Sequence, residues 1–270
     1  MKKIIITDGC SFTNWRTTWA TLLKETTQYE LFNLGRPGNS NDNVVGRFPE
    51  KFNRIHSDEN FDKSAVLIQL TGLDRKMIGN AISPSIGKVF GQSKWKSGIF
   101  KLFGMENPDD GSGAVYDWES YFLNEYTPEK HINELLKNII DLQSFFENLP
   151  DDIVEYKLLL GWDIFTTSDN NQWSTTDRYS NIDALLLKDE FESSKKYWED
   201  IDWSKFWFYE NENVKYGGIS QWVQYNCEPE DWYQANRSYN DNPNDRHPTY
   251  KAHGKFKEEV IEPMIKEMLG

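Results

Sequence analysis

The chain has 270 residues, of which 27% are charged, and a formal net charge of −13. This length suits one large α/β domain with a buried core, and the negative charge without a basic patch argues against a nucleic-acid partner. No stretch approaches the roughly 20 apolar residues of a membrane span, and the apolar run at the start is too short for a signal peptide. With two cysteines, Cys10 and Cys227, which make no disulfide framework, we expect a cytoplasmic protein without a membrane partner.

The first stretch with a clear pattern is residues 2–7, which are β-branched and apolar apart from two lysines. This pattern predicts a strand buried on both faces of a parallel sheet. Gly9 then permits a sharp turn, so Ser11 follows at the carboxyl end of the strand, where open α/β sheets bind ligands. The alternative is that Ser11 caps the next helix, which residues 15–25 predict by their apolar spacing. The two roles are compatible.

The next segments continue the alternation of strands and helices. Residues 29–34 are short and apolar-rich and predict a second strand, and the Gly, Pro, Asn and Ser residues of 35–41 predict a turn. Residues 41–55 have a helical spacing of apolar side chains. Residues 65–70 predict a third buried strand, which brings residues 71–75 to the same edge of the sheet as the first turn.

The middle of the chain contains its clearest helix. Residues 76–128 have no sustained period, and we interpret them as an insertion over the active-site edge. Residues 129–149 have apolar residues at a period near 3.6, and Pro150 ends the predicted helix. His131 is expected on the solvated surface of its first turn. Residues 155–165 predict a fourth strand.

The last third combines a second irregular region with a closing helix. Residues 166–239 are rich in tryptophan, and only residues 182–198 predict a helix there. This region is either a cap that shapes the substrate site or an oligomer interface, because clustered aromatic side chains need a cover. The aromatic residues either fill the core or line a sugar-binding groove. Residues 240–246 form a polar loop, and residues 255–269 predict the last helix.

Asp245 and His247 lie in this polar tail, and with Ser11 they have the residue types of a serine-nucleophile triad. Four short blocks of the sequence resemble, in order and approximate spacing, those of the SGNH (GDSL-like) hydrolases. The blocks are Gly9-Cys10-Ser11-Phe12, Asn33-Leu34-Gly35-Arg36-Pro37-Gly38-Asn39-Ser40-Asn41, Thr71-Gly72-Leu73-Asp74 and Asp245-Arg246-His247-Pro248. The chain looks like a divergent member of this family.

The resemblance implies a three-layer α/β/α sandwich around a central parallel sheet, of the flavodoxin-like SGNH type. It implies a single domain, 1–270, with the two irregular regions as insertions. It also implies that Ser11 is the nucleophile, His247 the general base and Asp245 the residue that orients the base. The backbone N–H groups of Ser11 and Gly38 would form the oxyanion hole, although on its own Gly38 could simply shape its loop.

Two departures from the family pattern concern the same site. The third block usually supplies an asparagine donor to the oxyanion hole, and Leu73 stands in its place. Leucine cannot donate a hydrogen bond, so Arg75 or Thr71 replaces that donor, or the hole has two donors, or the site is not catalytic.

The histidine block departs as well, because the aspartate stands two residues before the histidine, where the family usually has three. Asn244 occupies the family's usual position, and Asp241 is the fallback for the orienting role. His253 is a weaker candidate for the base, since it lacks the adjacent aspartate and proline.

These observations predict a serine esterase or acyl hydrolase that uses no cofactor. Family members cleave acyl esters of sugars, lipids and thioesters, and the aromatic insertions favour a carbohydrate O-acyl, chiefly O-acetyl, substrate. The four histidines show no close ligand pair, so we expect no metal. The alternative is a non-catalytic glycan-binding protein that keeps the fold. The sequence leaves the acyl chain, the alcohol and the oligomeric state open.

Overall fold

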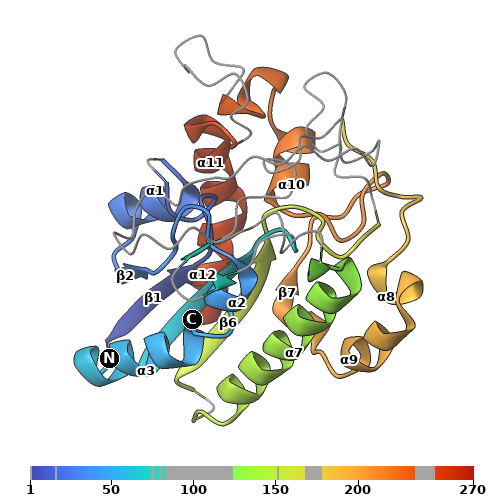
Figure 1. The fold of residues 1–270 in the computed structure, drawn as a ribbon. Coiled ribbons are helices and arrows are strands. Elements are labelled where there is room, and N and C mark those ends of the chain that lie inside the picture. The colour runs from blue at the N-terminus through green and yellow to red at the C-terminus, as the bar shows by residue number, and fades with distance from the viewer. Residues whose placement is uncertain are drawn as a thin grey trace.

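The computed structural model describes residues 2–15, 17–73, 77–78, 81–82, 124–150, 152–167, 178–234 and 247–270. Its centre is a five-stranded parallel sheet in the spatial order β2-β1-β3-β6-β7 (Figure 1). The strands are β1 (Lys3–Asp8), β2 (Glu30–Asn33), β3 (Lys63–Leu70), β6 (Val154–Leu160) and β7 (Phe206–Trp207). The predicted α/β class with a parallel sheet is confirmed.

The strand order creates a switch point. Counted along the chain, these five strands lie in the order 2-1-3-4-5, so successive strands are added on one side of β1 and then on the other. In doubly wound sheets a crevice opens at this point, beyond the carboxyl ends of the strands. Ser11 follows β1 and Thr71 follows β3, which places both at the carboxyl ends of the two strands that flank this switch point.

Helices cover both faces of the sheet (Figure 1). One layer contains α1, which contacts α11, and α12, which contacts β3 and β6; the other contains α2, α3 and α7. The main helices are α1 (Trp19–Thr26), α2 (Asn41–Val44), α3 (Phe48–Glu59), α7 (Pro128–Glu147), α8 (Leu187–Glu190), α9 (Lys195–Glu199), α10 (Ile219–Asn226), α11 (Tyr250–Phe256) and α12 (Glu262–Leu269). A π-helical segment, Lys257–Ile261, joins α11 to α12. Short 3₁₀ turns span Glu192–Ser194, Trp203–Lys205 and Pro229–Asp231, and β4 (Met77–Ile78) pairs antiparallel with β5 (Ala81–Ile82).

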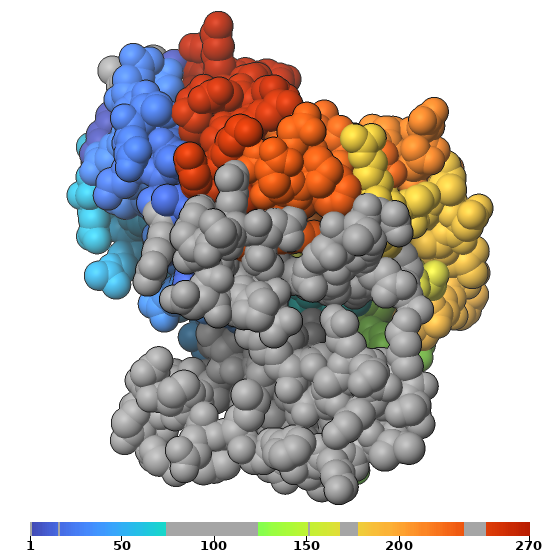
Figure 2. Space-filling view, turned by 90° about the horizontal axis from the view of Figure 1, so that it is seen from above, coloured from blue at the N-terminus to red at the C-terminus, as the bar shows by residue number. Residues whose placement is uncertain are grey.

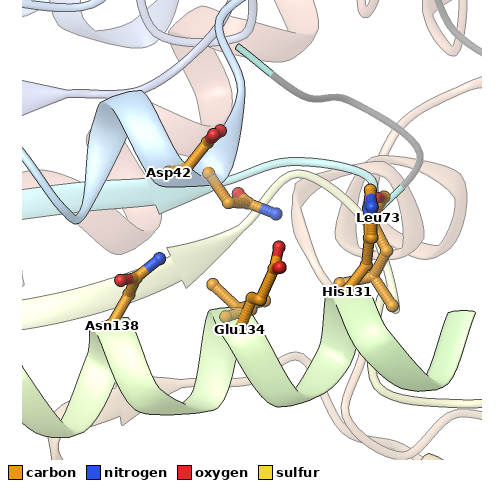
Figure 3. A pocket seen from close by; sticks show the side chains of 7 residues that line it. Asp42, Leu73, His131, Glu134 and Asn138 are labelled. Atoms are coloured by element: carbon orange, nitrogen blue, oxygen red, sulfur yellow. The ribbon is translucent and has the colours of Figure 1, made fainter. Parts of the chain in front are cut away.

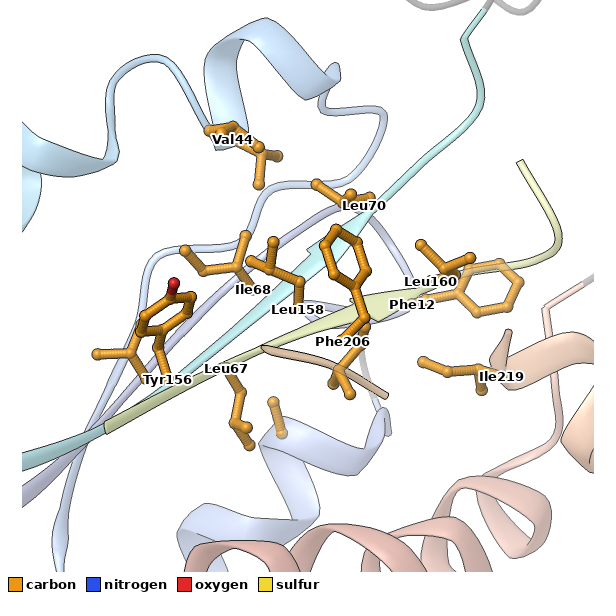
Figure 4. Close-up of a cluster of buried hydrophobic side chains, with 14 of the residues drawn as sticks. Phe12, Val44, Leu67, Ile68, Leu70, Tyr156, Leu158, Leu160, Phe206 and Ile219 are labelled. Carbon is orange, nitrogen blue, oxygen red and sulfur yellow. The ribbon is translucent and has the colours of Figure 1, made fainter. Parts of the chain in front are cut away.

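The buried core explains why the strands hold together. Each of Ile4, Ile5 and Ile6 is fully buried, as are the central residues of β3, so both faces of these strands are covered. Figure 4 shows the part of the core near the carboxyl edge, where Phe12 lies near Leu160 and Ile219. Because Phe12 directly follows Ser11, burial of its ring anchors the loop that carries the serine.

Several predicted elements have different bounds in the structure. The single helix expected over 41–55 is two helices, because the chain turns after α2 and starts again with Pro49 in the first turn of α3. The helix expected from residue 15 starts only at Trp19, with Thr18 at its N-cap, so Ser11 does not cap it. The strand expected over 155–165 ends at Leu160.

The second irregular region contributes more to the sheet than the sequence suggested. Its residues Phe206 and Trp207 form β7, which pairs with β6 and was not predicted. The helix expected over 182–198 is broken into α8, a 3₁₀ turn and α9. Most of the predicted 76–128 insertion and the 240–246 loop lie outside the described residues.

The last helix starts earlier than predicted, at Tyr250, and runs through the π-helical segment to Leu269. It ends beside the first strand, where the Lys3 ammonium donates to the Leu269 carbonyl oxygen at 2.6 Å. In the described part of the chain, every helix is too short or too polar to cross a bilayer.

Candidate active site

The loop after β1 presents Ser11 at the carboxyl edge of the sheet. Gly9 allows the chain to turn beside β3, because a Cβ atom at this position would lie only 3.0 Å from the Gln69 Cβ. Gln69 then holds the loop from below: its Oε1 accepts from the Cys10 N–H at 3.3 Å and from the Thr13 hydroxyl at 3.2 Å. Ser11 itself is only 6% exposed.

His247 meets Ser11 from the other end of the chain. The Nε2 atom of His247 lies 2.6 Å from the Ser11 Oγ, a hydrogen-bond distance between two residues 236 positions apart. Figure 2 shows this edge of the molecule from above, with the N-terminal segments in blue against the C-terminal segments in red. A serine hydroxyl hydrogen-bonded to imidazole is the arrangement that activates a serine nucleophile.

A segment that the sequence analysis did not single out fixes the His247 loop. The Gln234 N–H donates to the His247 carbonyl oxygen at 2.7 Å, and its side-chain amide donates to the Pro248 carbonyl oxygen at 3.0 Å. One residue on, the Thr249 hydroxyl donates to the buried Asp231 carboxylate at 3.1 Å. Asp231 also pairs with the Lys251 ammonium at 2.8 Å. Residues 231–234 therefore hold the histidine loop against the start of α11.

Aromatic rings surround the imidazole of His247. The ring centroid of buried Phe12 lies 5.5 Å away, and that of Trp15 lies 6.0 Å away with the two planes only 4° apart. On its far side Phe12 contacts Trp162, which follows β6, at 5.7 Å. These contacts limit rotation of the imidazole about its side-chain bonds.

The loop that was predicted to form the oxyanion hole is tied to the Ser11 loop by two hydrogen bonds. The Arg36 N–H and the Asn39 side-chain amide both donate to the Gly9 carbonyl oxygen, at 3.0 and 3.2 Å. Gly38 has a φ of 78°, which favours glycine, and a Cβ built there meets no heavy atom of the described residues within 4 Å. The turn, and not close packing against the described residues, therefore requires the glycine.

The third predicted block is organised by Asn41, another residue that the sequence analysis missed. Its side chain accepts from the Thr71 N–H at 2.7 Å and donates to the Thr71 carbonyl oxygen at 2.8 Å. The Thr71 hydroxyl is buried and, in the described part of the chain, has no hydrogen-bond partner. Arg75, the other predicted donor, lies outside the described residues, as do Asp245, Asn244 and Asp241.

His131 is not on the surface, as the sequence suggested, but 95% buried between α7 and the end of β3. Its Nδ1 lies 2.7 Å from the Leu73 carbonyl oxygen, to which it donates, and its ring contacts Tyr126 at 4.6 Å. Figure 3 shows it with Glu134 and Asn138 on α7, facing Asp42. The cavity between them holds only about 20 Å³, room for roughly one water molecule.

His253 does not meet Ser11 either. It lies in α11, 1% exposed, with its ring 6.3 Å from Phe12, and neither ring nitrogen has a partner among the described residues. Burial, and secondarily the neighbouring His247, lowers its pKa to about 3. His253 is therefore neutral near pH 7, and His247 is the histidine that lies within hydrogen-bond distance of Ser11.

A buried ion pair lies next to the loop that carries Ser11. The Asp8 carboxylate, fully buried, pairs with the Lys51 ammonium at 2.7 Å and accepts from the Gly9 N–H at 2.8 Å. Burial raises the pKa of Asp8, and the Lys51 charge opposes that shift without cancelling it. The described residues contain no group of three or more His, Cys, Asp or Glu side chains that could hold a metal ion.

Sequence signals exist for some of the missed residues and not for others. Gln69 is the one polar residue of the apolar run 65–70, which marks it as a buried hydrogen-bonding group. Gln234 and Asp231 lie in a polar stretch where nothing distinguishes them.

No protein-family model matches the chain, and a search of curated proteins found no significant match.

Proposed function

We propose that this protein is a serine ester hydrolase of the SGNH type that cleaves an acyl ester, chiefly an O-acetyl ester. The observation that carries the proposal is the 2.6 Å contact between the Ser11 Oγ and the His247 Nε2 at the carboxyl edge of the sheet. In this proposal Ser11 is the nucleophile and His247 the base. Asp245 orients the base, and no cofactor takes part.

The chemistry would proceed in two acyl-transfer steps. The Ser11 oxygen attacks the ester carbonyl carbon while its proton passes to the His247 Nε2. The tetrahedral intermediate collapses, the bond to the alcohol breaks, and His247 returns the proton to the leaving alkoxide. A water molecule then loses a proton to His247 and attacks the acyl-serine carbonyl carbon. The second tetrahedral intermediate collapses, the bond to the Ser11 oxygen breaks, and His247 returns the proton to that oxygen as the carboxylic acid leaves.

The oxyanion would be stabilised by the N–H groups of Ser11 and Gly38, with the Thr71 hydroxyl as a third donor. Support for Thr71 comes from its buried hydroxyl, which has no hydrogen-bond partner among the described residues, and from the two hydrogen bonds by which Asn41 holds its backbone. A preorganised donor of this kind contributes about 3 to 4 kcal/mol to the transition state.

The flavodoxin-like SGNH fold, with insertions at 76–128 and 166–239, is part of the proposal. Its support is the 2-1-3-4-5 strand order, in which Ser11 and Thr71 flank the switch point. A cytoplasmic location is also part of it, supported by Cys10 and Cys227, which are not joined in a disulfide.

The second candidate is a glycan-binding protein that does not catalyse hydrolysis. Leu73 favours it, because its side chain stands in the place of the family's asparagine donor and cannot donate a hydrogen bond. In this case the Ser11–His247 pair would remain without turnover.

A fluorophosphonate probe separates the two candidates, because it labels only an activated serine. We expect labelling of the wild type and none of Ser11→Ala or His247→Gln. The matched control is Ser57→Ala, an exposed serine on α3, which should label like the wild type. Circular dichroism verifies that each variant is folded. Absence of labelling in folded wild-type protein would refute the enzyme and favour the binder.

A further inference from the structure

Trp15 is exposed beside the catalytic pair, although the sequence placed it in the apolar stripe of the first helix. The side chain is 46% exposed, whereas Trp19, at the true start of α1, is fully buried. Exposure of so large an apolar ring costs free energy in water, and such a ring at a functional site is a contact surface for a ligand.

The geometry of Trp15 places its face next to the reacting atoms. Its plane is nearly parallel to that of His247, with centroids 6.0 Å apart. Because 46% of the Trp15 side chain is exposed, part of the indole surface stays open beside the imidazole, and a group attached to an ester at Ser11 can rest on it.

Hydrogen bonds of the loop hold the backbone of Trp15 in a fixed position. Its carbonyl oxygen accepts from the Thr21 hydroxyl at 3.0 Å. The preceding residue, Asn14, donates its N–H to the Cys10 carbonyl oxygen at 3.0 Å and its side-chain amide to the Gly35 carbonyl oxygen at 2.6 Å. These hydrogen bonds fix the backbone that carries the ring, so ordering of that backbone adds little cost when a ligand binds.

Three of the described tryptophans of the second irregular region are buried and do not compete for this role. Trp198, Trp222 and Trp232 are each at most 7% exposed and pack in the core. The rings of Trp198 and Trp203 pack against each other at an angle of 31° with centroids 4.2 Å apart, and both meet Phe165 edge to face at 5.4 Å. Those aromatic residues stabilise the fold, and among the described residues Trp15 is the exposed large apolar side chain on the nucleophile loop.

A groove that includes the residue before Trp15 carries polar groups. It has a volume of about 580 Å³, lies between β2 and α3, and its lining includes Asn14, Arg36, Phe32 and Ile55. Arg36 is exposed and offers guanidinium donors. An apolar ring face bordered by hydrogen-bonding groups matches a pyranose, whose C–H face is apolar and whose rim carries hydroxyls.

We propose that Trp15 is the stacking platform for a pyranose ring in the alcohol part of the substrate, which makes the substrate an O-acylated sugar. The inference rests on the proposed esterase function for its catalytic test and has an independent test by binding. Arg36 and Asn14 would then contact the hydroxyls of that ring or of the next sugar unit.

The catalytic test compares kcat/KM for monoacetylated methyl glucopyranoside with that for vinyl acetate, which has no ring. In Trp15→Leu the ratio of the two values should fall about tenfold, chiefly through KM of the sugar ester, and Trp15→Phe should retain most of it. The control is Leu185→Ala, another exposed apolar residue, which should leave the ratio unchanged. An unchanged ratio in Trp15→Leu would overturn the proposal. So would an equal loss on both substrates with a shifted pH profile, because Trp15 would then act through His247.

The binding test uses the Ser11→Ala protein and calorimetry with the same acetylated glucoside. We expect binding, and about tenfold weaker binding when Trp15→Leu is added. If the wild type hydrolyses neither ester, the esterase proposal fails, but the binding measurement still tests whether Trp15 is a stacking platform. Two results would overturn the proposal that Trp15 is a stacking platform: no detectable binding to folded Ser11→Ala, or an affinity that is unchanged by Trp15→Leu.

Discussion

His253 should make the stability of this protein fall steeply in acid, and its replacement by leucine should remove that dependence. The imidazole is 1% exposed, its two nitrogens have no partner among the described residues, and its pKa is lowered to about 3. In the unfolded chain the pKa returns to about 6.5. The unfolded state then binds the extra proton, so stability is retained above pH 6.5 and lost as the pH falls toward 3.

The size of the effect follows from the two pKa values. With 6.5 in the unfolded chain and about 3 in the folded protein, His253 costs about 1.4 kcal/mol at pH 5.5 and about 2.7 kcal/mol at pH 4.5. His253→Leu replaces the ring with an apolar side chain and leaves no buried nitrogen unpaired. Its free energy of unfolding, relative to wild type, should therefore increase by about these amounts as the pH is lowered from 7.5.

Equilibrium unfolding in urea at pH 7.5, 5.5 and 4.5 measures this difference directly. Ser57→Ala on α3 serves as the control, since its difference from wild type should be constant with pH. The reasoning is refuted if the gap between His253→Leu and wild type stays within about 0.5 kcal/mol over this range, which would mean that His253 is hydrated or paired. Fluorophosphonate labelling of His253→Leu near pH 7 should persist, because this residue is not the base.

Three further predictions concern the site. Ser11→Ala, His247→Ala and the double variant should lose similar esterase activity, because members of a triad act as a unit; losses that multiply would contradict the shared proton transfer. Thr71→Val should lower kcat about a hundredfold with little change in KM if the hydroxyl donates to the oxyanion, and an intact kcat would exclude Thr71 as a donor. The free energy of unfolding of Asp8→Asn, relative to that of the wild type, should increase as the pH rises from 4 to 7. The raised pKa of Asp8 means that the folded wild type holds the proton more tightly and loses stability as the carboxyl ionises. Urea unfolding at pH 4, 5.5 and 7 measures the trend, and the opposite trend would show that the Lys51 pair outweighs burial.

The pattern of apolar residues predicted β1, β3, β6 and α7 within a few residues, because each buries its side chains in a regular period of its own. Predictions failed where contacts with segments distant in sequence, and not the local pattern of residues, determined the structure. The expected surface position of His131 was wrong because the end of β3 lies over the first turn of α7 and offers the Leu73 carbonyl oxygen. The strand β7 is two residues long and has no periodicity to detect.

For the candidate site, the sequence by itself determined which residue types are present: a serine after a buried strand, a glycine in a turn, and a histidine near the end of the chain. Only the tertiary structure decided that Ser11 and His247 lie 2.6 Å apart, that His253 is buried without a hydrogen-bond partner among the described residues, and that Trp15 is exposed. It also decided that Gln234 and Asn41 hold the loops in place. The physical reason is that these properties depend on contacts between segments up to 236 residues apart, whose free energies no local pattern of side chains encodes.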